Sequence, residues 1–120
     1  MSDTNVTIRD TPAQVADAVL DAIEANPAAF DMATWFWPRG PRRTLLPEQT
    51  PECGTTMCIA GWAAHLTGWT LLSDGLSGSR DGVTEDVADI AAEALGLTMH
   101  NIFYDSADEA IECLREIAGR

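Results

Sequence analysis

The run Met57–Leu66, with the sequence MCIAGWAAHL, is apolar on nearly every side of a helix. Such a helix is stable in water only where other elements cover it. We therefore predict a buried helix over residues 57–66, capped by Thr55 or Thr56 and closed by Gly68. Gly61 lowers helix propensity in its middle, which makes sense if another backbone packs closely there. This helix is expected to be the centre of the fold.

An earlier helix is predicted to begin at Thr11-Pro12, where an N-cap residue precedes proline at the first helical position. Apolar residues then recur at helical spacing, and acids occupy the other side. The apolar positions are Val15, Val19, Ala22 and Ile23. Asn26-Pro27 ends this helix or bends it into a second short helix that runs to Met32.

Two more helices are predicted in the C-terminal half. Thr84 is expected to cap the first, with two acids in its first turn, and Gly96 to end it. Ser106 and Glu109 form a capping box for the last helix. Residues 69–83, rich in glycine and serine, are predicted to be a connection with several turns, or a hairpin.

Prolines interrupt the middle of the chain, since four of the six lie within residues 33–56. This segment is predicted to be a long ordered loop or a small hairpin. The fold class predicted is mostly α, or α+β with one small hairpin, with four to five helices packed around a central buried helix at about 57–66. Residues 1–10 are expected to be a flexible N-terminus. Residues 11–118 are expected to form a single helical domain with a Pro/Arg-rich loop at about 38–56.

The net charge of the chain limits the classes of partner that it can bind. Nineteen acids oppose seven bases, all of them arginine, for a net charge of −12. This charge repels nucleic acid and anionic membranes, so we expect no direct nucleic-acid binding and no membrane association. It suits docking on a basic protein surface, although a solvated acidic coat explains it equally well. No apolar run approaches the ~20 residues of a membrane span and no signal peptide is evident, so a cytoplasmic location is expected.

Three cysteines, Cys53, Cys58 and Cys113, are an odd number for a disulfide framework, although a local Cys53–Cys58 bridge remains open. Cys58 would lie in the first turn of the helix at 57–66, where backbone amides stabilise a thiolate. His65 lies about 10 Å further along that helix, at ~1.5 Å per residue, and cannot serve as its base. Cys58 with His100 is therefore the catalytic candidate of a small cysteine-dependent hydrolase or transferase, against the simpler interpretation of core cysteines.

The same cysteines and histidines are chemically suitable zinc ligands. Their spacings do not form two close ligand pairs, so no metal site is predicted. No cofactor is predicted either.

The Pro/Arg-rich loop is the predicted contact site for another protein, because arginine and tryptophan are preferred interface anchors. Its candidate binding residues are Trp35, Trp37, Arg39, Arg42 and Arg43. Two simpler roles stay open: the tryptophans anchor the core, and the arginines pair with the acidic helices. The acids of residues 81–116 support a further alternative, a mimic of nucleic acid that competes for a basic cleft.

The segment Cys53-Gly54-Thr55-Thr56-Met57-Cys58-Ile59-Ala60-Gly61-Trp62-Ala63, with the later Leu95-Gly96-Leu97-Thr98 and Ile102-Phe103, resembles small uncharacterised proteins of actinobacteria and their phages. The resemblance covers roughly residues 15–115. It implies a phage or prophage setting and carries no catalytic residues. The leading functional hypothesis is therefore a non-enzymatic interaction protein that binds and modulates a host protein.

Overall fold

The computed structural model describes residues 11–32, 35–37, 44–49, 55–97 and 106–120. Over these ranges the chain has four α-helices and a small three-stranded antiparallel sheet, so the fold is the α+β form of the predicted class. The elements are α1 (Pro12–Ala25), a 3-10 turn η1 (Pro27–Ala29), α2 (Ile59–Leu66), β1 (Thr70–Leu71), β2 (Ser77–Arg80), β3 (Val83–Asp86), α3 (Val87–Leu95) and α4 (Ala107–Ala118).

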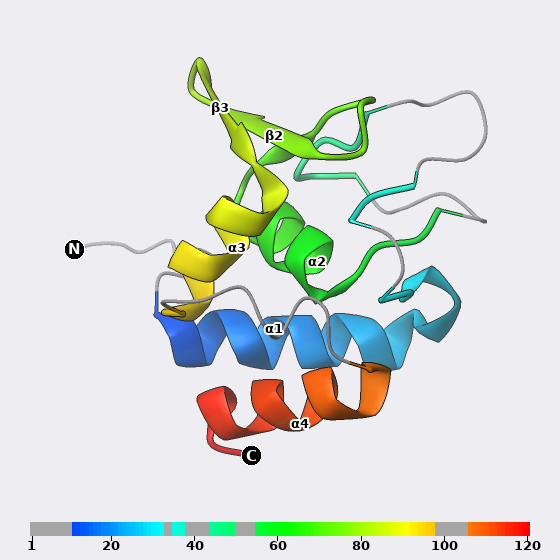
Figure 1. The fold of residues 1–120 in the computed structure, drawn as a ribbon, viewed down its shortest axis with the longest axis vertical. Coiled ribbons are helices and arrows are strands. Elements are labelled where there is room, and N and C mark those ends of the chain that lie inside the picture. The colour runs from blue at the N-terminus through cyan, green and yellow to red at the C-terminus, as the bar shows by residue number, and fades with distance from the viewer. Residues whose placement is uncertain (1–10, 33–34, 38–43, 50–54, 98–105) are drawn as a thin grey trace.

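The helices are arranged on both sides of α1 (Figure 1). The helix α4 packs on one side of α1, whereas α2 and α3 pack on the other side and against each other. The sheet lies beyond α2 and α3, with β1 against α2. None of the helices in the described ranges is both long and apolar enough to cross a bilayer.

The predicted starts of the first and last helices are confirmed. The Thr11 hydroxyl accepts a hydrogen bond from the Gln14 N–H, and the Gln14 side chain accepts one from the Thr11 N–H, which makes a capping box at α1. Ser106 and Glu109 make the predicted capping box at α4. Gly96 ends α3 in the left-handed conformation, as predicted.

The predicted start of the buried helix is wrong by two residues. Met57 donates to the Ala29 carbonyl at 2.8 Å, and Thr56 exchanges hydrogen bonds with Trp37 in an isolated bridge. These extended contacts hold residues 56 and 57 outside the helix, so Cys58, rather than Thr55 or Thr56, is the N-cap of α2. The predicted burial is confirmed, because every residue from Ile59 to His65 is buried.

The close backbone approach predicted at Gly61 is present. A Cβ added at Gly61 would overlap the carbonyl oxygen of Trp35 and would lie 2.8 Å from the Cβ of Met57. Glycine is therefore needed here because the segment around Trp35 crosses directly over α2.

The predicted cap at Thr84 is wrong, because residues 83–86 form a strand. Asp81 and Gly82 both have positive φ, 53° and 82°, and make a two-residue turn. The turn reverses the chain so that Thr84 pairs with Ser79 of β2. The helix α3 therefore begins at Val87, two residues later than predicted, with Asp86 as its N-cap. The hairpin predicted within residues 69–83 is thus a three-stranded sheet that extends to residue 86.

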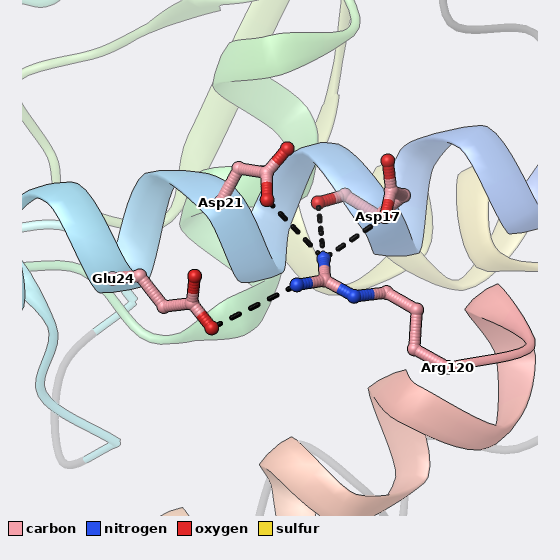
Figure 2. A network of polar contacts seen from close by, with 4 residues as sticks. All are labelled: Asp17, Asp21, Glu24 and Arg120. Atoms are coloured by element: carbon pink, nitrogen blue, oxygen red, sulfur yellow. Dashed lines mark hydrogen bonds and ion pairs between the residues drawn. The ribbon is translucent and has the colours of Figure 1, made fainter.

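The end of α4 is held against α1 by both packing and charge. Ala110 and Leu114 are fully buried on α4. Beyond α4, Arg120 reaches three carboxylates on α1, as Figure 2 shows. Its guanidinium lies 2.9 Å from Asp17, 3.2 Å from Asp21 and 3.7 Å from Glu24. Asp21 and Asp17 raise the pKa of Arg120, so this guanidinium stays charged.

Candidate functional site

The catalytic candidate Cys58 lies in the core, where 1% of its surface is exposed. Burial raises the pKa of its thiol, and the backbone N–H groups of Gly61 and Ala60 at the start of α2 lower it by less. A nucleophilic thiolate needs the opposite balance. His100, the proposed base, and Cys53 lie outside the described residues. The geometry of the described residues therefore gives Cys58 a packing role.

Alkylation is expected to show that Cys58 is a poor nucleophile. At about neutral pH, iodoacetamide should modify native Cys58 at least about tenfold more slowly than the half-buried Cys113, because a buried neutral thiol is unreactive. Mass spectrometry of the modified peptides against pH gives both rates, and urea-unfolded chain supplies the control in which they converge. Rapid modification of Cys58 with an apparent pKa well below ~8.5 would restore the enzyme hypothesis.

A second buried polar group is His65 on α2, which the sequence analysis favoured neither as a base for Cys58 nor as a zinc ligand. It is 5% exposed, and its ring meets that of Trp62 edge-on with the ring centroids 6.0 Å apart. The Nδ1 atom of His65 and the Nε1 atom of Trp62 are both buried and have no hydrogen-bond partner within the part of the chain that the structure describes. Burial lowers the pKa of His65. A hydrogen bond with the backbone of Gln49 raises this pKa, but by less. The imidazole is therefore neutral at pH 7.

His65 is expected to make the fold sensitive to mild acid. Because the pKa of His65 is lower in the folded chain than its ordinary 6.5, the unfolded chain binds the proton first. The stability that His65 contributes is complete above pH 6.5 and is lost as the pH falls below it. Urea unfolding at about pH 7.5 and about pH 5.5 measures the loss, which should be smaller in His65→Phe. Equal losses in both proteins would show that other groups cause it.

The predicted binding residues do not share one environment. Trp35 is half-buried and packs on the core, whereas Trp37 two residues later is 56% exposed. The hypothesis that both tryptophans are core anchors is therefore wrong for Trp37. Arg39, Arg42 and Arg43 lie outside the described residues.

Sequence reasoning missed two exposed leucines. Leu46 is 38% and Leu76 is 56% exposed. The segment of Leu76 lies beside that of Trp37, because a Cβ on Gly75 would lie 2.8 Å from the Phe36 carbonyl oxygen. The segment of Leu46 lies beside β1, where Leu45 pairs with Leu71 through two hydrogen bonds of 2.9 Å. We name Trp37, Leu46 and Leu76 the apolar surface. Its sequence signals were weak, a Leu-Leu pair and a leucine after Asp-Gly.

The arginines that the structure describes all make contacts within the chain. The Arg80 guanidinium lies 5.3 Å from the centre of a Trp69 ring and donates to the Thr67 carbonyl at 2.8 Å. Arg115 lies 3.9 Å from Glu112, and Arg120 contacts α1. The acids of α3 and α4 lie on exposed positions, as expected of solvated helix faces.

In the described ranges, histidine, cysteine and acidic side chains form no group of three or more that could hold a metal ion. Comparison of the chain with protein-family models, with curated proteins and with solved structures finds no match.

Proposed function

We propose that this chain is a non-enzymatic interaction protein that binds a host protein and modulates it. The observation that supports the proposal is the apolar surface, in which Trp37 and Leu76 are exposed on adjoining segments and Leu46 is exposed on the segment that pairs with β1. Single exposed apolar residues are ordinary, but a group of them on neighbouring segments is typical of a contact site. The phage or prophage setting and the cytoplasmic location belong to this proposal.

Affinity in this proposal comes from burying Trp37 and its neighbours, while the net charge of −12 steers encounter with a basic partner. Arg39, Arg42 and Arg43 would supply charged contacts to the partner. The buried helix α2 would serve as the scaffold under the segments that carry the surface. The cysteine-dependent hydrolase or transferase receives no support from the burial of Cys58, and we do not propose it.

Affinity capture from an actinobacterial host lysate tests the proposal. Trp37→Ser and Arg42→Glu are the test variants, and each has a matched control. Ile117→Ser removes a partly buried apolar side chain on α4, and Arg115→Glu reverses a charge on the same helix. Mass spectrometry should find one protein captured by the wild type and by both controls but lost with both test variants.

A captured protein that all four variants retain would contradict the contact site. A partner lost with neutralised acids of residues 85–93 and 108–116, and retained by the test variants, would favour the nucleic-acid mimic instead.

A further inference from the structure

The strand β3 forms an open edge of the sheet. The strand order is β1-β2-β3, so β3 has a neighbour on one side only among the described residues. All four of its residues, Val83–Asp86, are exposed. At the other edge, Leu71 of β1 is bridged to Leu45. The two edges of this sheet therefore differ: among the described residues, β1 is bridged to another segment and β3 is not.

The turn before β3 sets which backbone groups face outward. Positive φ at both Asp81 and Gly82 is the type I′ geometry, in which the flanking pair is hydrogen-bonded. That pair is Arg80 and Val83. Hydrogen-bonded and non-hydrogen-bonded pairs alternate along an antiparallel ladder. The N–H and C=O of Thr84, the next residue, therefore point away from β2.

A contact at the other end of β3 gives the same alternation of residues that face β2 and residues that face outward. Val87 donates its N–H to the carbonyl of Leu76 at 2.8 Å, on the side of β2. Counting back from Val87, residues 85 and 83 also face β2, and residues 86 and 84 face outward. The outer edge thus offers the N–H and C=O of Thr84 and the N–H of Asp86.

The charges around this edge are acidic. Asp81, Glu85, Asp86 and Asp89 are all exposed. The adjacent Arg80 lies 3.9 Å from Asp81, while its guanidinium also lies over Trp69 and donates to the Thr67 carbonyl just after α2. Like charges opposite each other destabilise paired strands, so pairing of two copies through β3 is disfavoured. A strand with basic side chains would be favoured by the same rule.

We propose that β3 binds an extended, lysine- or arginine-bearing segment of another protein by strand addition. Outward backbone groups of Thr84 and Asp86 supply the main-chain hydrogen bonds, and the surrounding carboxylates select basic side chains. This site is at the opposite edge of the sheet from the β1 side. It uses the side chain of none of the three residues of the apolar surface, although the Leu76 carbonyl accepts the Val87 N–H at the end of β3. Its test does not depend on the proposed function.

A fluorescein-labelled peptide of alternating threonine and lysine residues tests the site by anisotropy, with a threonine–glutamate peptide as control. Thr84→Pro removes the outward N–H and leaves the charge and the β2 ladder unchanged, since proline is tolerated on an edge where the N–H faces solvent. Thr84→Ala keeps the N–H and is its matched control. We expect binding of the lysine peptide only, weakened about tenfold by Thr84→Pro and within about twofold of wild type for Thr84→Ala.

A second pair of variants distinguishes binding at β3 from general attraction of the lysine peptide to an acidic chain. Glu85→Gln should weaken binding about threefold, and Glu116→Gln, an equal charge change on α4, should not. No binding of the lysine peptide, or equal binding by Thr84→Pro and Thr84→Ala, overturns the proposal. Where Thr84→Pro unfolds, hydrogen exchange of the wild type decides: slower exchange at the Thr84 and Asp86 amides on peptide addition supports the site, and unchanged exchange overturns it.

Discussion

Replacement of Gly61 by alanine is expected to lower the free energy of unfolding by about 3 kcal/mol, at the upper end of overpacking penalties. The new Cβ would overlap the Trp35 carbonyl oxygen and press on the Cβ of Met57. The Trp35 oxygen belongs to the backbone and the Met57 Cβ is bonded directly to it. Neither atom can therefore move aside as the tip of a flexible side chain would. Urea unfolding followed by circular dichroism measures the change.

The sign of this effect is itself informative. Within an exposed helix, glycine to alanine stabilises by about 1 kcal/mol, so a stabilised Gly61→Ala would show that no backbone crosses α2 there. Gly82→Ala is a suitable control, because a Cβ at Gly82 meets nothing within 4 Å and only its positive φ opposes the change. That variant should lose about 1 kcal/mol.

Replacement of Leu114 by alanine is expected to cost about 3 kcal/mol of stability. Leu114 is the one large apolar side chain of α4 that is fully buried, and it faces the layer formed by α1. Its loss leaves a cavity between the two helices that neighbouring side chains fill only in part. Denaturant unfolding should show a lower midpoint with an unchanged slope.

Arg120→Ala separates packing from charge at the same interface. Arg120 contacts three carboxylates, but its guanidinium is exposed and its ion pairs are screened by solvent and salt. We expect a small decrease in melting temperature that disappears as salt is added. A loss as large as that of Leu114→Ala would mean that charge, rather than apolar burial, holds α4 in place.

Local chemistry made the helix ends predictable wherever a side chain caps its own helix. Thr11 with Gln14 and Ser106 with Glu109 close their hydrogen bonds three residues away, and Gly96 needs only its own positive φ. These interactions involve neighbours in the sequence. They can therefore be identified without knowing where the rest of the chain lies.

The start of α2 and the strand β3 could not be predicted in this way. Met57 is held extended by hydrogen bonds to a segment about 27 residues earlier, around Ala29 and Asp31. Thr84 is a good N-cap residue, but the Asp81-Gly82 turn pairs it with Ser79 instead. In both places a distant or cross-strand partner takes a position that local propensity alone assigned to a helix.

For the candidate sites too, local sequence predicted some properties, and others depended on contacts between distant segments. Burial of Cys58 could be predicted from its apolar neighbours, yet its place as the N-cap depended on contacts with other segments. Trp35 and Trp37 look alike in sequence, and only the crossing over α2 distinguishes the half-buried one from the exposed one. The leucines of the apolar surface carried no sequence signal strong enough to select them.

The amino-acid sequence by itself determined that α2 would be buried and that the surface would be strongly acidic. It also determined that the first and last helices, α1 and α4, would be capped and amphipathic. These properties follow from hydrophobic pattern, capping chemistry and charge, which are local or additive. Tertiary structure alone decided the extended entry into α2, the exposure of Trp37 and the open edge at β3. Those features depend on which backbone groups find partners elsewhere in the chain, because a buried N–H or C=O must be paired and the nearest partner is set by the fold.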